Sequence, residues 1–314
     1  MMGLRLVLPL VFIIAAGNIL RGKGFYNNID IDTLMKTLFW VILPPLMVRS
    51  TYIAGKEVLS QPNLLIASTI CYLFSVIIAY FAASRFAHKG NTKRIAVSAF
   101  ASLRSNNVYL GFPVVEIALG TAGLHYASLF LAVTQIPFQF ISVASSELIL
   151  SGRLTFESFK VSVKKIATNP IIVSAVIGIT MACFELKIPF VADKAMEIIS
   201  GSATTFALLA LGGTLDLKGG LKRLFEIIRE TWVDILVKLI INPAIMYLCL
   251  KFFPIPKELF CVSVTLTAMP TAVNTFVMSQ AMGMDAQYAA DLVAATTILA
   301  IVAIPIWATI GGMI

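Results

Sequence analysis

The stretch Arg104-Ser-Asn-Asn-Val-Tyr-Leu-Gly-Phe-Pro113 interrupts an apolar run that otherwise extends from about residue 95 to residue 119. Asparagine competes with the helix backbone for hydrogen bonds, and proline removes a backbone donor and clashes with the preceding turn. A second interruption, Met269-Pro270-Thr-Ala-Val-Asn274, falls inside a later apolar run. We interpret each stretch as a helix broken near its middle, in preference to a simple proline kink.

The composition indicates which solvent surrounds these runs. Hydrophobic residues make up 59% of the 314 positions and charged residues 13%, with a mean hydropathy of +0.91. Soluble domains carry about twice that share of charge, and a membrane helix needs about 20 apolar residues. The sequence therefore predicts an all-α polytopic membrane protein with ten transmembrane helices and no soluble catalytic or signalling domain. The predicted spans are residues 4–20, 31–50, 63–86, 95–119, 123–150, 167–185, 196–215, 231–252, 258–282 and 286–312.

The loops between the spans predict the orientation. With the N-terminus outside, the inner loops hold about twice as many Lys and Arg residues as the outer loops. The positive-inside rule then places both termini on the outer side of the cell (inner, cytoplasmic) membrane. The net charge of +8 does not indicate nucleic-acid binding, because the basic residues form short clusters without interleaved aromatic residues. Two histidines and four scattered cysteines give no metal-binding spacing, so we expect no metal site.

The chain also contains traces of an internal repeat. Five spans precede a basic linker and five follow it, and an odd number per half means that the second half is inverted. Pro9 and Gly17 recur as a proline and a glycine 161 residues further on. We predict a first five-helix repeat at 1–150, a cytoplasmic linker at 151–166 and an inverted second repeat at 167–314. Broken helices at equivalent places in inverted halves are a sequence signal for a transporter's binding site.

The broken helices also suggest the sign of a ligand. Half-helices beginning near Pro113 and Pro270 would direct backbone amides and positive dipole ends into the crossing, which suits a carboxylate. Asn106, Asn107 and Asn274 add neutral hydrogen-bond donors. The opposite half-helix ends carry free carbonyls that would suit a cation, so an anion is favoured and a cation stays open.

These residues resemble the auxin efflux carrier family, which includes the plant PIN-FORMED transporters and many bacterial carriers. Both interrupted spans are similar to family signatures, as are Asn169-Pro170 and Leu211-Gly212-Gly213, and the resemblance covers the whole chain. Unlike the plant members, this chain has no long hydrophilic loop between spans 5 and 6, and Asn274 lies close to where they have a second proline. The bacterial relatives suggest small carboxylates such as malate or malonate, in preference to auxin-like acids.

The resemblance implies that the spans form two domains with different roles. Spans 1, 2, 6 and 7 would form a scaffold, and spans 3–5 and 8–10 a transport domain that moves as an elevator within a homodimer. By motif position, Asn106 takes the place of the family's substrate-contacting asparagine, and Pro113 and Pro270 take those of the crossover prolines. The predicted substrate-binding residues are Asn106, Asn107, Gly111, Pro113, Pro270, Thr271, Asn274 and Arg104.

Charged residues inside spans are further functional candidates. Arg104 either binds a substrate carboxylate with two parallel hydrogen bonds, pairs with Glu116, or caps half-helix carbonyls. Glu116 and Asp291 are candidates for proton or ion coupling. Asp234 and Lys238, spaced i and i+4, predict a local surface ion pair.

Two glutamines complete the set of polar candidates. Gln135 and Gln139 share one face of span 5, where they either line the substrate path or hydrogen-bond between helices, and we favour hydrogen bonding.

The leading functional hypothesis is a secondary transporter of small organic anions. Its expected partners are a small carboxylate and the lipid bilayer, with no cofactor other than a coupling proton or Na⁺. The alternative is a sodium- or proton-coupled symporter or antiporter of the bile-acid-carrier or cation-antiporter type, with Glu116, Asp291 and Thr271 as available ligands. An enzyme is not expected, because the chain lacks a GxSxG motif, a histidine-rich zinc motif and an aspartyl pair.

Overall fold

The computed structural model describes residues 2–55, 61–152, 156, 160, 163–164, 167–214 and 220–314. Most of the predicted linker at 151–166 lies outside these residues. The described elements are all helical, apart from an isolated β-bridge between Ser105 and Thr271.

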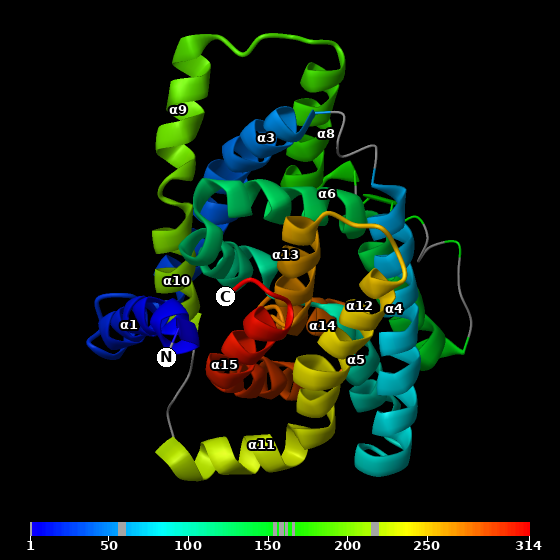
Figure 1. Ribbon diagram of the computed structural model, residues 1–314. Helices are drawn as coiled ribbons and strands as arrows, with labels where there is room; N and C mark the ends of the chain where they lie inside the picture. Colours follow the sequence, from blue (N-terminus) through cyan, green and yellow to red (C-terminus); the bar gives the residue numbers. More distant parts are fainter. Residues whose placement is uncertain are drawn as a thin grey trace.

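The helices follow the apolar runs of the sequence (Figure 1). Several runs contain a π-helical turn, labelled η, between two α-helices. The first half of the chain contains α1 (Met2–Gly22), α2 (Asn28–Thr37), η1 (Leu38–Ile42), α3 (Leu43–Ala54), α4 (Pro62–Ala82), η3 (Ala83–Ala87), α5 (Thr92–Leu103), η4 (Asn107–Gly111) and α6 (Phe112–Ser151). The second half contains α8 (Pro170–Cys183), α9 (Phe190–Ser200), α10 (Ala203–Thr214), α11 (Gly220–Leu236), η5 (Val237–Ile241), α12 (Asn242–Lys251), α13 (Lys257–Thr267), α14 (Thr275–Ala281) and α15 (Ala286–Ile310).

Six helical segments of the described chain are long and apolar enough to cross a membrane, and two shorter helices are also apolar. The chain is therefore an all-helical polytopic membrane protein. The six segments are Asn28–Ile53, Pro62–Ala87, Asn107–Ser151, Phe190–Thr214, Lys222–Lys251 and Ala286–Ile310, and the shorter helices are Leu8–Gly22 and Pro170–Cys183.

The start of α11 differs from the sequence prediction. We expected a loop up to residue 230 and a span from residue 231, but the helix begins at Gly220. Leu224, Ile227 and Ile228 recur at helical spacing among charged residues, so this segment forms an amphipathic helix. It runs across one end of the molecule before the chain turns into α12 (Figure 1).

Two groups of helices pack closely. In the first group, α3 packs against α8 and α9, and α1 packs against α10. Glycine makes the second contact possible, because a Cβ on Gly212 would lie 2.0 Å from the carbonyl oxygen of Ile14. In the second group, α4 packs against α5, α6 and α12, while α13 packs against α6 and α12. The groups meet where α6 contacts α3 and where α10 contacts η4.

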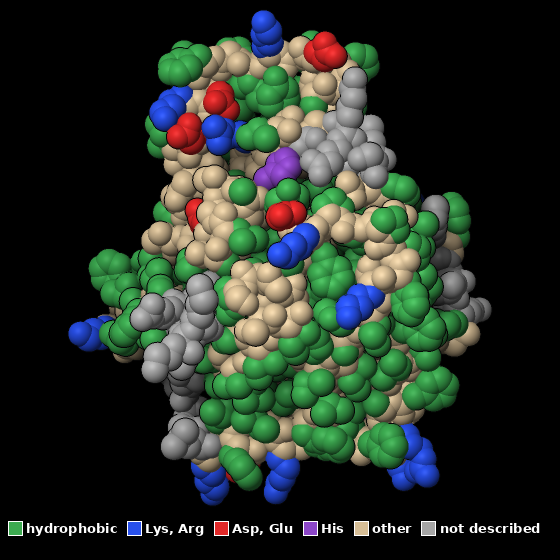
Figure 2. Space-filling model, viewed as in Figure 1, with side chains coloured by type: hydrophobic (Ala, Val, Ile, Leu, Met, Phe, Trp, Pro, Cys, Tyr) green, Lys and Arg blue, Asp and Glu red, His purple; other side chains and the backbone are tan. Residues whose placement is uncertain are grey.

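The surface is mostly apolar where it would face lipid. Large hydrophobic side chains lie exposed on several helices, including Phe12, Phe81 and Leu248. On the face in Figure 2, Lys and Arg side chains line the lower edge, and acidic and basic side chains mix at the top. Hydrophobic side chains cover much of the surface between them, as the composition predicts.

Candidate functional site

Two helices break at one place, and their breaks pair with each other. The helix α5 ends at Leu103 and helical structure resumes at η4, while α13 ends at Thr267 and α14 follows after an extended segment. The amide of Asn106 donates to the carbonyl of Pro270 at 2.8 Å, and the amide of Ala272 donates to the carbonyl of Arg104 at 2.9 Å. Backbone groups that the breaks release are thus satisfied by the opposite break, as a low-dielectric environment requires.

We had expected half-helices that begin near Pro113 and Pro270. The α-helix α6 does begin beside Pro113, at Phe112, but it continues the turn η4 that precedes it. After the breaks, helical structure resumes at Asn107 and at Thr275. Asn106 explains the first start, because its side-chain oxygen accepts a hydrogen bond from the amide of Tyr109 at 3.3 Å and caps the new turn. Pro113 is the second residue of α6, following the wide turn of η4, and Pro270 lies in the extended segment.

A cavity of about 540 Å³ opens beside the paired breaks. Four of the eight predicted substrate-binding residues line it: Arg104, Asn106, Asn107 and Asn274. The other four, Gly111, Pro113, Pro270 and Thr271, do not line it. Gly111 has a packing role, because a Cβ at this position would lie 2.6 Å from the side chain of Leu266 on α13.

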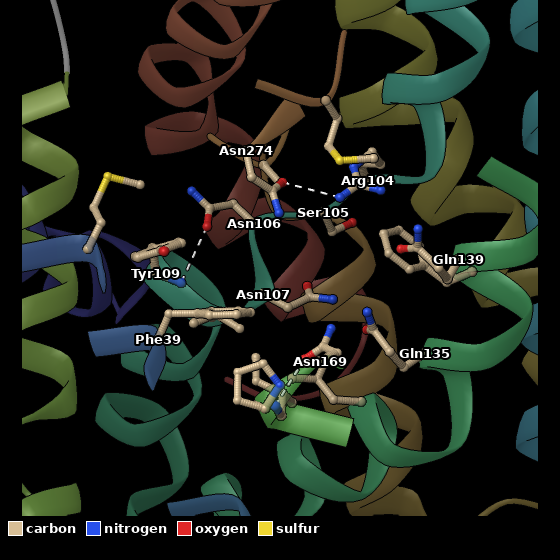
Figure 3. Close-up of a pocket in the computed structure, with 18 of the residues that line it drawn as sticks. Phe39, Arg104, Ser105, Asn106, Asn107, Tyr109, Gln135, Gln139, Asn169 and Asn274 are labelled. Atoms are coloured by element: carbon tan, nitrogen blue, oxygen red, sulfur yellow. Dashed lines mark hydrogen bonds between the residues drawn. The ribbon is translucent and has the colours of Figure 1, made fainter. Parts of the chain in front are cut away.

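Arg104 lines this cavity and has hydrogen-bond donors that no described residue accepts from. Its side chain is buried, with 4% of the residue exposed, and its guanidinium lies 4.5 Å from the ring centre of Phe100 and 4.9 Å from that of Phe138. Nη2 donates to Oδ1 of Asn274 at 3.3 Å (Figure 3), whereas Nε and Nη1 have no partner among the described residues.

The expected alternative of an ion pair between Arg104 and Glu116 is wrong. Glu116 lies on α6 and accepts a hydrogen bond from the hydroxyl of Thr204 on α10 instead. It does not line the cavity. The break separates Arg104 from Glu116 by irregular backbone, so their sequence spacing is not a helical spacing.

Amide side chains form the rest of the polar lining. The side-chain nitrogen of Asn106 and the side-chain oxygen of Asn107 are buried without a partner in the described chain. Gln135 and Gln139 line the cavity. We had favoured hydrogen bonds between helices for these two side chains, and the structure instead supports the alternative that they line the path. Figure 3 shows Gln135 beside Asn107 and Asn169.

Asn169 is a cavity residue that sequence reasoning did not assign to the site. It comes from the second half of the chain, and its side-chain oxygen accepts from the amide of Ile171 at 2.9 Å to cap α8. The available signal was the Asn-Pro pair before an apolar run, which predicts a helix start. Nothing in that local pattern predicts that the cap faces a cavity.

Asp291 belongs to a neighbouring cavity of about 510 Å³. Its carboxylate pairs with Arg223 at 2.9 Å. The two cavities share Asp32, Met35 and Asn274 as lining residues, so Asn274 lies between them.

The expected surface ion pair between Asp234 and Lys238 is also wrong, because both residues are buried and bond elsewhere. Lys238 Nζ donates to the hydroxyl of Ser105 at 2.6 Å and to the carbonyl of Thr267 at 3.3 Å. Asp234 accepts from the hydroxyl of Tyr288 at 2.5 Å. Lys238 lies in the π-helical turn η5, and the wider turn rotates the two side chains apart.

Asp234 is the centre of a buried polar network. The hydroxyl of Ser98 donates to its carboxylate at 2.9 Å, and Nε2 of His88 lies 2.8 Å from the hydroxyl of Tyr288. Nearby, Asp285 caps α15 through the amide of Tyr288. Burial would raise the pKa of Asp285, but that amide and Arg94 outweigh it and hold the pKa below its usual range.

Comparison with known proteins gives matches along nearly the whole chain. Residues 2–308 match the family described as membrane transport protein. The chain is 26% identical to a Rhizobium meliloti (strain 1021) protein named "Putative malonate transporter", over 98% of this chain and 94% of that protein. It is 25% identical to a Methanothermobacter thermautotrophicus protein named "Uncharacterized transporter", over 97% of each chain. The matched residues include both broken helices.

Proposed function

This chain belongs to the membrane transport protein family, and we propose that it carries small organic anions through the crossing of its two broken helices. It is a membrane transporter and not an enzyme. The proposed cargo is a small carboxylate that binds in the cavity beside the crossing.

The observation that carries this proposal is the guanidinium of Arg104. Its Nε and Nη1 atoms are buried without a partner in the described chain, and so is the side-chain nitrogen of Asn106, which lines the same cavity. Leaving a buried charged donor unpaired is unfavourable by several kcal/mol. A carboxylate would accept from two guanidinium N–H groups at once and neutralise the charge.

The name of the Rhizobium relative supports the size and class of the cargo. Malonate and malate are small enough for a cavity of about 540 Å³. One carboxylate would bind Arg104, and the other end of the molecule would face the amides of Asn107, Gln135 and Asn169.

We further propose ten spans in two inverted five-helix repeats. In this arrangement the two packing groups of helices act as separate bodies. The scaffold contains the first group together with α2, so that it comprises α1–α3 and α8–α10. The transport domain contains the second group together with α11, α14 and α15. The transport domain slides past the scaffold as an elevator, in a homodimer in the cell membrane with both termini outside.

Uptake of labelled malonate, malate and several monocarboxylates into proteoliposomes tests the function. We expect saturable uptake of at least one small acid by the wild type. Arg104→Met keeps the packing against Phe100 and Phe138 but removes the donors, so uptake is expected to fall about tenfold or more. Arg49→Met is the matched control, because Arg49 pairs with Asp193 away from the cavity.

Two results would overturn the proposal. One is a folded wild-type protein that transports none of the acids in the panel. The other is an Arg104→Met variant whose uptake equals that of the wild type.

A further inference from the structure

Lys238 is a buried cation that has no acidic partner in the described part of the chain. Only 1% of the residue is exposed, and no described carboxylate forms an ion pair with it. A lone ammonium in the middle of a membrane protein is unfavourable unless other groups compensate its charge.

The compensating groups are the carbonyl ends of the broken helices. Lys238 Nζ donates to the carbonyl of Thr267, the last residue of α13. It also donates to the hydroxyl of Ser105, and that hydroxyl donates to the same carbonyl at 3.1 Å. The C-terminal end of a helix carries about half a negative charge, so it is a place where a cation is stabilised.

The other broken helix is capped from the same element. Asn242, one turn after Lys238, donates its side-chain amide to the carbonyl of Ser102 near the end of α5, at 2.9 Å. Residues of η5 and α12 therefore bind carbonyls at the ends of both first half-helices. At one of these ends the bound group is the ammonium of a lysine.

We propose that the ammonium of Lys238 is a tethered counter-cation at the crossing, and that it takes the place that a coupling metal cation such as Na⁺ would need. The site is next to the transport path, because Ser105 lines the cavity that contains Arg104. Transport by this carrier is then independent of Na⁺. This inference rests on the proposed function for its role in transport, but the cation site itself does not depend on the cargo.

The test measures thermal stability in detergent and uptake in proteoliposomes, with NaCl or choline chloride at equal ionic strength. The wild type is expected to give the same Tm and the same uptake in both salts. Lys238→Ala removes the charge and leaves a space beside two oxygen acceptors. It is expected to lose several degrees of Tm and most of its uptake, and to regain part of both as Na⁺ or methylammonium is added.

Lys238→Gln supplies a variant that keeps an amide donor for Ser105 and Thr267 but lacks the charge, in case the alanine variant does not fold. It is expected to show the same gain with added cation. Lys251→Ala is the matched control, because Lys251 is an exposed lysine at the end of α12 that contacts the ring of Tyr247. Its Tm is expected to be the same in either salt.

Three results would overturn the proposal. The first is Na⁺-dependent uptake by the wild type. The second is a Lys238→Gln variant whose Tm and uptake in choline chloride equal those of the wild type, and the third is a folded variant whose lowered Tm and uptake do not rise with any small cation. The Tm measurements need no substrate. If no acid is transported but the variants still gain stability with cations, the cargo proposal fails and the tethered cation stands.

Discussion

At the scale of single residues, the guanidinium of Arg104 packs against aromatic rings and is not paired with a carboxylate among the described residues. Stacking on Phe100 and Phe138 gives a guanidinium favourable contacts without using its N–H groups. An acidic partner would occupy the donors that a ligand needs. The buried, stacked arginine is therefore suited to a ligand that enters and leaves.

Asn106 is also expected to donate a hydrogen bond to the ligand. Asn106→Asp keeps an oxygen that can cap η4. It replaces the free amide nitrogen with an oxygen, so that a neutral amide becomes a negatively charged carboxylate. We expect the fold to be retained and uptake of carboxylates to fall by about tenfold or more, equivalent to about 1.5–3 kcal/mol for a hydrogen bond to a charged group. Uptake kinetics and Tm check this. The control is Asn63→Asp, because Asn63 binds the exposed carbonyl of Pro254 away from the cavity, and equal uptake by Asn106→Asp and the control would contradict the prediction.

A second prediction concerns the hydroxyl of Tyr288, which lies between Asp234 and His88. Tyr288→Phe leaves the buried carboxylate with one hydrogen-bond donor fewer. We expect the free energy of unfolding to fall by about 1–3 kcal/mol, measured as a lower Tm in detergent. The KM for uptake is expected to stay unchanged, because Tyr288 lines neither cavity.

Tyr80→Phe is the matched control for this hydroxyl, since Tyr80 is exposed on α4. An equal Tm for the two variants would show that the hydroxyl of Tyr288 contributes nothing to the stability of the fold. A change in KM with an unchanged Tm would place Tyr288 in substrate binding instead.

At the scale of helices, close packing in the first group depends on glycine. The contact of α1 with α10 leaves no room for a side chain at Gly212, where a Cβ would lie 2.0 Å from a backbone oxygen of α1. Backbone cannot move aside as a flexible side chain can. This contact is therefore fixed by the absence of a Cβ.

We predict that Gly212→Ala separates α1 from α10 and lowers the free energy of unfolding by about 1–3 kcal/mol or more. The measurement is Tm in detergent together with the yield of monodisperse protein. Gly22→Ala is the control, because a Cβ there meets nothing within 4 Å, although both residues lie in helices. If both variants unfold at the same temperature, the close approach does not contribute to stability.

At the scale of the whole molecule, the proposed elevator requires the two groups of helices to slide past each other. The contact between Glu116 on α6 and Thr204 on α10 joins the groups. The contact between Arg49 on α3 and Asp193 on α9 lies within one group. The first contact would break during each transport cycle, and the second would persist.

Cross-linking tests this difference. In a background without native cysteines, Glu116→Cys with Thr204→Cys, joined by a short reducible thiol reagent, is expected to abolish uptake, and reduction is expected to restore it. Arg49→Cys with Asp193→Cys, treated in the same way, is expected to retain uptake. Full uptake by the cross-linked Glu116–Thr204 pair would rule out sliding at this interface.

Local chemistry predicted much of this protein. Apolar runs predicted an all-helical membrane protein, and the Asn, Gly and Pro clusters marked the positions at which two helices break. The same patterns could not place the half-helix starts, because Asn106 caps a turn well before Pro113. They also paired Asp234 with Lys238, since spacing along a regular helix does not anticipate a π-helical turn.

The sequence by itself determined that the chain lies in lipid, that it is helical, and where two of its helices break. Hydropathy and backbone hydrogen bonding decide these properties over a few neighbouring residues. Only the tertiary structure decided which groups meet at those weak points. Three contacts join residues that are far apart in the chain: the pairing of Asn106 with Pro270, the packing of Arg104 against Phe138, and the hydrogen bond of Lys238 to Ser105. Burial makes these contacts decisive, because a buried polar group must be satisfied by whatever packing brings near it.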